Sequence, residues 1–457
     1  MEIRKWFALG FALLILVIPG CSKNDNNSHP VVTSPATSTF APDVAKEWMD
    51  LCYRAVKVSS ISPPVASRIY GFVGVTLYEA LVPGMPEYVS LVGQLDALNS
   101  LPQPTRNTLY DWPTVANNAV ATVMTTLFTN APDSIRNEIT TLRDAWNVTR
   151  QSAVAAEVYD RSLQLGLQMA NSIITWAGSD GYTEYNNCAY TPPVGEGLWV
   201  PTPPAFAAPL QPCWGQLRTF VLERNGSALQ CDPTAPPAFS TDKTSVYYKE
   251  AMQLYITSQT LTDEQRAIAN FWADGATATG TPPGHWISIA GQLLVQQGMN
   301  LADAAEAYAR AGIAVHDAFI SCWKAKYQLN AMRPITFVQA YIDATWSPLL
   351  TTPNFPSCPS GHSTSSGAAS VALEGLFGTV AFTDHTQDAL GYPARSFTSL
   401  QQAANEAAIS RLYAGIHYSS DNDIGLVQGS CLGNLINSKL HFRVPARGHS
   451  QAFKLTE

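Results

Sequence analysis

The chain has 457 residues, of which 46% are hydrophobic and 14% are charged, and its formal net charge is −8. This acidic balance argues against a nucleic-acid-binding protein, which would carry a basic stripe, and the low charge argues against intrinsic disorder. No internal stretch reaches the roughly 18 unbroken apolar residues of a spanning helix, which disfavours an integral membrane bundle. The length predicts two or three domains, or one large elaborated domain with a sizeable core.

The N-terminal residues have the pattern of a targeting signal. Two basic residues, Arg4 and Lys5, precede a short apolar run from Trp6 to Ile18, and a small residue comes directly before Cys21. The run is too short to span a membrane as a helix. The pattern resembles a bacterial lipoprotein signal, which predicts cleavage before Cys21 and a lipid anchor on its thiol. The alternative is an ordinary secretory signal followed by an incidental cysteine.

The residues around the predicted cleavage point set the expected location. Residues 1–20 are assigned to the signal peptide, and residues 21–45, rich in Ser, Thr, Asn and Pro, to a flexible tether. Ser22, directly after the cysteine, favours the outer membrane. The sequence therefore predicts an extracytoplasmic lipoprotein on the periplasmic or cell-surface side of a bacterial outer membrane.

Most of the remaining chain has the apolar spacing of helices. Apolar residues recur three and four positions apart, whereas strand signals are few. In chain order, the pattern predicts helices over residues 66–82, 114–129, 133–146, 150–177, 263–273, 285–298, 300–331, 362–377, 399–414 and 422–440.

Residues 46–445 are predicted to form one helical catalytic unit built from two bundles. The N-terminal bundle covers residues 46–180 and the second bundle residues 246–445. Ten of the 31 prolines fall in the intervening region, 181–245, among Trp, Tyr and Phe side chains. These aromatic residues indicate a segment wrapped over the surface rather than a linker. The expected fold class is all-α, interrupted by this long proline-rich irregular excursion.

Seven cysteines follow Cys21, and none of them forms a CxxC pattern. This excludes thiolate zinc sites and thioredoxin-like chemistry, whereas an oxidising compartment would permit disulfides. Cys213 and Cys231 bracket a polar loop and form the predicted pair. Cys322, in an alanine-rich helical stretch, is predicted to be a buried free thiol.

The first chemical motif contains Lys326 and Arg333, followed by Pro334. Seven residues make two helical turns, so the two cations are expected on one face of a helix that Pro334 ends. Two cations with no acidic residue nearby indicate an anion site. The alternative is a solvated basic face.

The second motif is Pro359-Ser360-Gly361-His362, followed by a helix rich in Ala, Gly and Ser. A turn that runs into a helix start presents free backbone N–H groups and a hydroxyl, which together favour an oxyanion. His362 is expected at the rim, where it can exchange a proton. The alternative is a helix cap beside a structural histidine.

The third motif runs from Ser410-Arg411 to His417 and Asp421. The four-residue spacing lets Asp421 orient the imidazole of His417. Gly415 is expected to break the helix so that Arg411 and His417 converge. The alternative is a helix end with an exposed histidine.

Together the motifs supply five cation-capable groups within about one hundred residues of an acidic protein, as a cage for a tetrahedral oxyanion would require. Their pattern resembles the superfamily of type-2 acid phosphatases and vanadium-dependent haloperoxidases, and every motif residue matches. Its bacterial iodoperoxidase branch is the most similar, on the lipoprotein start, the length and the segment Pro282 to Trp286. The resemblance implies two helical bundles with the anion in the core of one.

The resemblance implies one of two chemistries. In a haloperoxidase, one vanadium(V), as vanadate, binds His417, and hydrogen peroxide then oxidises iodide to hypoiodous acid. The catalytic residues would be His362, Lys326 and His417, and phosphate would compete with vanadate. The cofactor oxygens would be held by Lys326, Arg333, Ser360, Gly361, His362 and Arg411. In an acid phosphatase, His417 would instead accept the phosphoryl group. A non-catalytic surface lipoprotein is the third alternative.

Two aromatic positions favour the haloperoxidase. By the resemblance, Trp323 and Phe355 line the halide pocket, and the absence of a histidine at Phe355 favours iodide as substrate. Asp421 and Asp274 are expected in the surrounding shell, with Asp274 paired with Arg411. His285, like His316, is expected to be structural.

Overall fold

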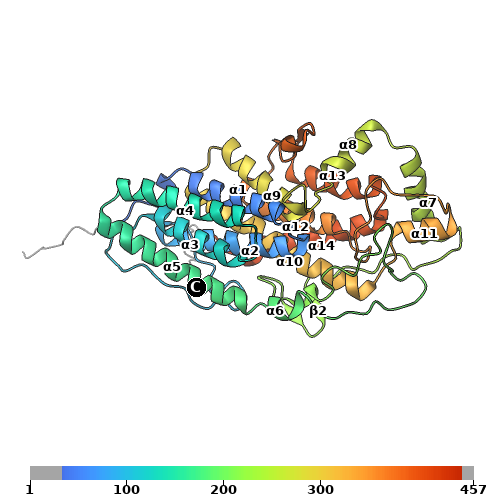
Figure 1. The fold of residues 1–457 in the computed structure, drawn as a ribbon, viewed down its shortest axis with the longest axis horizontal. Coiled ribbons are helices and arrows are strands. Elements are labelled where there is room, and N and C mark those ends of the chain that lie inside the picture. Colours follow the sequence, from blue (N-terminus) through green and yellow to red (C-terminus); the bar gives the residue numbers. More distant parts are fainter. Residues whose placement is uncertain (1–32, 445–457) are drawn as a thin grey trace, which may run out of the picture.

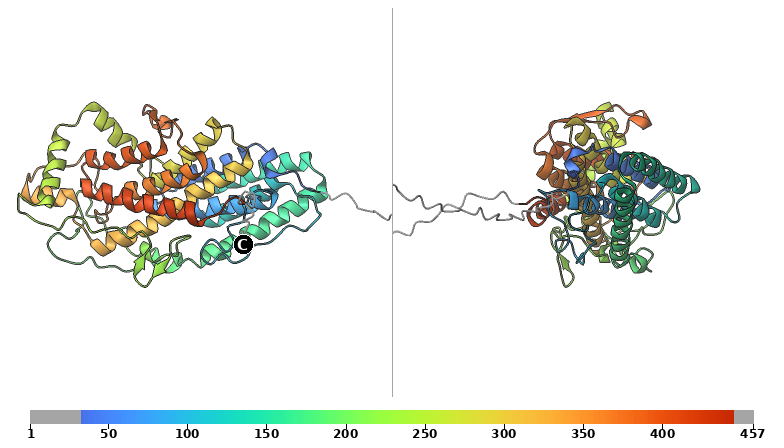
Figure 2. Two further views of the ribbon diagram at one scale, coloured as in Figure 1. Left: turned by 180° about the vertical axis from the view of Figure 1, so that it is seen from behind. Right: turned by 90° about the vertical axis from the view of Figure 1, so that its left-hand side faces the viewer.

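The computed structural model describes residues 33–444. They form 14 α-helices and two short antiparallel hairpins, which confirms the predicted all-α fold. Figure 1 shows an elongated molecule with α1 to α5 at one end and α7, α8, α11 and α13 at the other, and the two views of Figure 2 show the same lengthwise packing from behind and end-on. The division into two bundles at residues 180 and 246 stays a prediction.

The first five helices precede the proline-rich excursion, and a sixth, a single turn, lies at its start. They are α1 (Asp43–Val58), α2 (Pro63–Leu81), α3 (Trp112–Leu127), α4 (Asp133–Ala153), α5 (Ala156–Gly178) and the single turn α6 (Tyr182–Tyr185). The excursion also contains a short 3₁₀ helix, Trp214–Gln216, and the hairpin of β1 (Arg224–Asn225) and β2 (Ala228–Leu229).

The other eight helices follow the excursion, and the motif residues lie on them or in the short segments between them. They are α7 (Val246–Gln259), α8 (Asp263–Phe271), α9 (Thr281–Gln296), α10 (Leu301–Leu329), α11 (Pro334–Tyr341), α12 (Gly361–Phe377), α13 (Leu400–Tyr413) and α14 (Ser419–Lys439). A second hairpin, β3 (Phe382–Asp384) with β4 (Arg395–Phe397), lies between α12 and α13.

Four helices have no counterpart in the sequence prediction: α1, α6, α7 and α11. The most consequential is α11, because Pro334 begins this helix instead of ending the preceding one. The preceding helix, α10, ends at Leu329, where Asn330 adopts a left-handed conformation (φ 45°). Asn is one of the few residues that takes this conformation readily, and it often ends helices.

Helix α10 is the central element of the fold. Asn300 begins it with a capping box completed by Asp303, and nine of its 29 residues are alanine, the residue with the highest helix propensity. It packs against α2 on one side and α12 on the other, and almost all its residues are buried. The last two turns of this rigid helix carry Trp323 and Lys326.

Helices α12 and α14 pack so closely that a side chain in place of glycine at their contact would push them apart. A Cβ atom on Gly429 would stand 2.2 Å from the backbone oxygen of Thr364, and one on Gly425 would stand 2.8 Å from that of Ser360. Glycine at these positions therefore brings the N-terminal ends of the two helices together. The second and third motifs lie at these ends.

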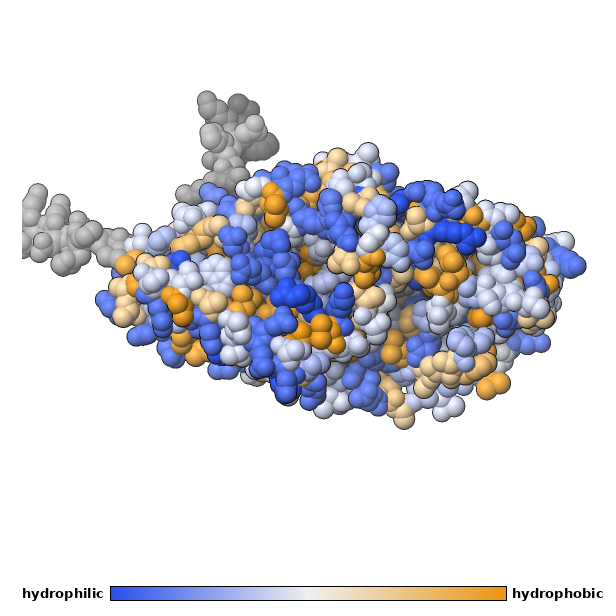
Figure 3. Space-filling view, turned by 45° about the horizontal axis from the view of Figure 1, so that its top comes forward, coloured by the Kyte–Doolittle hydropathy of each residue, from blue (hydrophilic) through white to orange (hydrophobic). Residues whose placement is uncertain are grey.

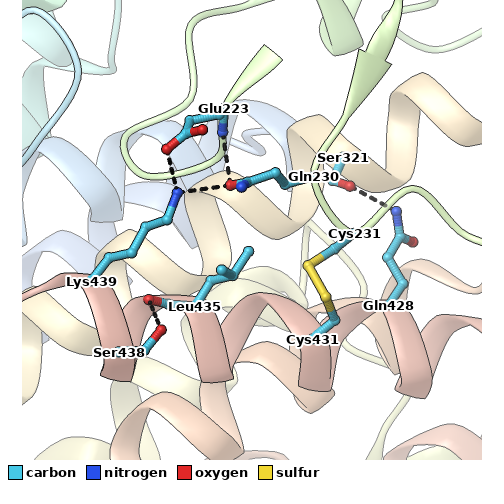
Figure 4. The surroundings of a disulfide bond; sticks show 9 residues. All are labelled: Glu223, Gln230, Cys231, Ser321, Gln428, Cys431, Leu435, Ser438 and Lys439. Atoms are coloured by element: carbon cyan, nitrogen blue, oxygen red, sulfur yellow. Dashed lines mark hydrogen bonds and ion pairs between the residues drawn. A yellow bond between two sulfur atoms is a disulfide. The ribbon is translucent and has the colours of Figure 1, made fainter. Parts of the chain in front are cut away.

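Two disulfides replace the predicted pair of Cys213 with Cys231. Cys188 bonds to Cys213 within the excursion, and Cys231 bonds to Cys431 of α14. Figure 4 shows the second bridge, which joins segments 200 residues apart in sequence. The prediction was wrong because it paired cysteines by sequence proximity. Cys322 is a buried free thiol, as predicted.

One helix, Pro63–Gly84, has the length and hydropathy of a membrane-spanning segment, but 94% of its most apolar window is buried in the fold. This burial is what a core helix requires. On the face shown in Figure 3, hydrophobic residues are scattered among hydrophilic ones. The predicted signal peptide, Cys21 and the predicted tether up to residue 32 lie outside the described residues, whereas residues 33–45 of the tether include a short 3₁₀ helix, Thr37–Thr39, and the start of α1.

Candidate functional site

The N-terminal end of α12 forms one side of the candidate site. Ser360 is the N-cap of this helix, and its hydroxyl accepts a hydrogen bond from the backbone N–H of Ser363 (3.4 Å). The first N–H groups of a helix, here those of Gly361 and His362, have no partner within the helix. Together with the helix dipole, they favour a negatively charged ligand.

Lys326 and Arg333 converge on this end, but not in the predicted way. Arg333 lies outside α10 and caps α11, so the two residues do not share a helix face. Instead, both donate to the loop that precedes α12. Lys326 Nζ donates to the carbonyl oxygens of Pro356 (2.9 Å) and Ser357 (2.8 Å), and Arg333 Nε donates to that of Phe355 (2.7 Å). The loop carbonyls therefore place both cations.

The third cation, Arg411, comes from the last turn of α13. Its Nη1 atom donates to the carbonyl oxygen of Trp272 (2.8 Å), and it lines the same cavity as His362 and His417. Gly415 has φ +77°, a conformation that glycine adopts without strain. This turn reverses the chain after α13 and confirms the predicted break.

His417 is held in one orientation by two neighbours. Its Nδ1 atom lies 3.0 Å from Asp421 Oδ2, and its Nε2 atom lies 3.1 Å from Arg333 Nη1. Arginine only donates, so Nε2 is the accepting nitrogen and Nδ1 carries the proton. The expected contact between Asp421 and His417 is present, and the lone pair on Nε2 faces the cations.

Burial changes the pKa values of the three cations. Desolvation lowers the pKa of Lys326 to about 8, that of Arg333 to about 9 and that of Arg411 to about 10. These shifts show that the positive charges lack sufficient anionic compensation, because a paired carboxylate would raise the pKa. An anion bound among Lys326, Arg333 and Arg411 would provide this compensation.

Both histidines favour the neutral form. The pKa of His362 and that of His417 are lowered well below 6.5. Burial is the larger cause, and the positive charge of a nearby arginine is the next. In His362 the Nε2 atom is buried without a hydrogen-bond partner, as are Arg333 Nη2 and Arg411 Nε. Unpartnered buried polar atoms are costly, so their presence in one site indicates a polar ligand.

Asp274 lies in the site but does not form the expected ion pair with Arg411. Both its oxygens stand 3.0 Å from His285 Nδ1, and Oδ1 also accepts from Gln387. The other ring nitrogen of His285 stands 2.7 Å from Asp384 Oδ2. The two aspartates raise the pKa of His285 to about 10, against the effect of burial. The protonated ring therefore compensates part of the carboxylate charge.

Trp323 and Phe355 line the cavity, as expected for the halide pocket. Their ring centroids are 4.9 Å apart, and Lys326 Nζ lies 5.0 Å from the Phe355 centroid. The cavity measures about 370 Å³ and has His362, Arg411 and His417 among its lining residues. An apolar aromatic wall thus adjoins the cationic end.

Sequence reasoning missed several residues of the site, among them Ser357, Leu210 and Phe319. The Ser357 hydroxyl donates to Asp421, and Leu210 of the excursion lines the cavity. Ser357 stands two residues before Pro359, so its position next to the second motif was a usable signal. No local signal identified Leu210, because its role depends on how the excursion folds back.

Comparisons with known proteins agree with this geometry. Residues 306–444 match the family model described as the VCPO second helical-bundle domain. A solved structure, that of the first bacterial vanadium-dependent iodoperoxidase, is 36% identical with a TM-score of 0.81, over 88% of this chain and 97% of that one.

The chain belongs to the vanadium-dependent haloperoxidase family.

Two further relatives show how far this likeness extends. The vanadium chloroperoxidase of Curvularia inaequalis is 32% identical over 129 residues, which cover 23% of this chain and only 21% of that protein. A holo-type bacterial vanadium-dependent chloroperoxidase is 16% identical with a TM-score of 0.64, over 84% of this chain and 94% of that one. The latter likeness shows the fold alone. This haloperoxidase therefore has the same fold as that enzyme along most of its described length.

Proposed function

We propose that this haloperoxidase binds one vanadate and uses hydrogen peroxide to oxidise iodide to hypoiodous acid. The observation that carries the proposal is the buried cationic cage, in which Arg333 Nη2 and Arg411 Nε lack partners beside an oriented His417. Such a cage suits a small oxyanion with several oxygens.

The residues fit vanadate in charge and in donor type. His417 Nε2 would bind the vanadium, since its lone pair faces the cations and Asp421 fixes the ring. The oxygens would be held by Lys326, Arg333, Arg411, Ser360 and the N–H of Gly361. When bound, vanadate supplies Lewis-acid activation of hydrogen peroxide without changing its own oxidation state.

His362 is suited to moving protons at its Nε2 atom. The atom is buried and unpartnered, and the lowered pKa leaves the ring neutral and able to accept a proton. Asp274 Oδ2 lies 3.9 Å from this atom, so its negative charge would stabilise the protonated ring. His362 Nε2 would thus accept a proton from hydrogen peroxide and pass it to a leaving hydroxide, which departs as water.

Iodide suits the aromatic wall formed by Trp323 and Phe355. It is large, polarisable and weakly hydrated, so it loses little solvation on entering the pocket, and it is the most easily oxidised of the three halides. The iodoperoxidase likeness supports the same choice. We expect clear iodide oxidation, weak or absent bromide oxidation and no chloride oxidation.

Reconstitution of purified apo-protein with orthovanadate tests the proposal. Triiodide formation should appear only after vanadate is added, and phosphate should inhibit it by competing for the same cage. Phosphate-ester hydrolysis is measured in parallel without vanadate. Ester hydrolysis without vanadate-dependent triiodide formation would favour the phosphatase activity instead.

We also propose that the enzyme is anchored in the outer membrane through Cys21. The two disulfides among the described residues support an oxidising, extracytoplasmic location. A Cys21→Ala variant should lose labelling by radioactive palmitate and leave the membrane fraction. Equal labelling of the variant and the wild type would contradict the anchor.

A further inference from the structure

The proline-rich excursion contributes a rigid wall to the cavity. The carbonyl oxygen of Leu210 accepts hydrogen bonds from Trp323 Nε1 (3.2 Å) and the Tyr327 hydroxyl (2.7 Å), while its N–H donates to the carbonyl oxygen of Asn354 (3.0 Å). The disulfide of Cys213 closes three residues later. All these contacts use backbone atoms of Leu210, so its side chain is free to line the cavity.

The cavity is divided by polarity. Its cationic groups and Asp274 belong to the oxyanion end, whereas Leu210, Phe319 and Trp323 present apolar surface. The indole N–H of Trp323 is already used by Leu210, so this wall offers no free donor. Gly275 and Thr351 also line the cavity and are solvent-exposed, which places them at its rim.

The cavity is larger than an oxyanion and a halide require. Its volume is about 370 Å³, and a dry cavity of roughly 150 Å³ can hold a benzene molecule. The rings of Phe319 and Trp323 lie 5.1 Å apart and extend the aromatic surface beyond Phe355. Offset or edge contacts with aromatic faces favour an aromatic ligand, and the lack of charge on this wall favours a neutral one.

We propose that the wall formed by Leu210, Phe319 and Trp323 binds a neutral aromatic molecule of one or two rings, which receives iodine inside the cavity. The inference rests on the proposed iodide oxidation. The iodine of hypoiodous acid bonds to a ring carbon, the iodine–oxygen bond breaks, and the ring proton joins the hydroxide. The products are an iodoarene and water.

Binding is tested first on the apo-protein without vanadate, with phenol as the probe and saturation-transfer NMR as the readout. Leu210→Ala should weaken phenol binding about tenfold, since it removes several apolar contacts, and Leu210→Trp should abolish saturable binding by filling the space. Leu390→Ala, at a position that is 40% exposed and outside the cavity lining, is the control and should bind as the wild type. Cyclohexanol should bind more weakly than phenol.

Several results would overturn the inference. They are no saturable phenol binding to the wild type, unchanged binding in folded Leu210→Ala, and equal binding of cyclohexanol. The vanadate-loaded enzyme provides a second readout, the ratio of ortho to para iodophenol. This ratio should differ from that of reagent hypoiodous acid in the wild type and approach it in Leu210→Trp. Loss of triiodide formation in the wild type would instead refute the proposed function, whatever the apo-protein binds.

Discussion

Replacing Asp421 by Asn tests how strongly the ring of His417 is controlled. The buried carboxylate accepts from His417 Nδ1 (3.0 Å), from the backbone N–H of Tyr418 (3.2 Å) and from the Ser357 hydroxyl. Asparagine keeps the shape and one accepting oxygen but removes the charge. A hydrogen bond to a charged group contributes roughly 1.5–3 kcal/mol, against about 1 kcal/mol for a neutral pair.

The difference, about 0.5–2 kcal/mol, corresponds to roughly a 2- to 30-fold change in an equilibrium constant. Partners that orient a ligating histidine typically contribute about 10–100-fold to metal affinity. Vanadate titration of apo-protein should therefore give a dissociation constant about 10–100 times higher for Asp421→Asn than for the wild type. Circular dichroism should show that the fold is kept.

The exposed pair of His385 and Asp388 provides a matched control, because its Nδ1–Oδ2 distance is 2.9 Å but both side chains are more than half exposed. Asp388→Asn should leave vanadate affinity unchanged. An Asp421→Asn variant with affinity within twofold of the wild type would refute the orienting role of Asp421.

Four further outcomes are expected. His362→Ala should retain vanadium but lose about 100–10,000-fold in turnover, because it removes the proton carrier; near-normal rates would assign that role elsewhere. Phe355→His should change the ratio of iodide to bromide oxidation more than it changes vanadate affinity, and a loss of vanadium would place the residue in the cage. The pKa values of His362 and His417 lie below 6.5 in the folded apo-protein, so the unfolded chain gains protons first as pH falls. Below pH 6.5, the free energy of unfolding measured with urea should therefore fall with decreasing pH more steeply for the wild type than for a variant with both histidines replaced by Gln. The difference should be up to about 2.7 kcal/mol per pH unit, and an equal dependence of the two free energies on pH would contradict the lowered pKa values. Replacing both Cys231 and Cys431 by Ser should lower the free energy of unfolding by at most about 5 kcal/mol, given the 200-residue separation, and an unchanged urea midpoint would show that the bridge does not stabilise the fold.

The parts of the site that the sequence predicted are those made by local structure. Ser360 and Gly361 begin a helix, and Gly415 turns the chain, because these residue types favour those conformations wherever they occur. His417 and Asp421 contact each other because only four residues, about one helical turn, separate them. Such features can be predicted without knowledge of the tertiary fold.

The parts that the sequence did not predict depend on distant contacts. Lys326 and Arg333 meet because a loop about 30 residues later offers carbonyl oxygens to both. Asp274 pairs with His285, whose second partner lies on a hairpin 99 residues away. The bridge of Cys231 follows from the docking of the excursion on α14, which spacing along the chain does not encode.

The most direct test of the central claim is the vanadium content of wild type and His417→Ala after reconstitution with orthovanadate, with iodide oxidation measured on the same samples. The wild type should bind one vanadium per chain and oxidise iodide, whereas His417→Ala should lose both together, because it removes the nitrogen that would bind the vanadium. His385→Ala, at an exposed histidine, should behave as the wild type. Stoichiometric vanadium in His417→Ala, or a vanadium-loaded wild type that leaves iodide unoxidised, would contradict the account.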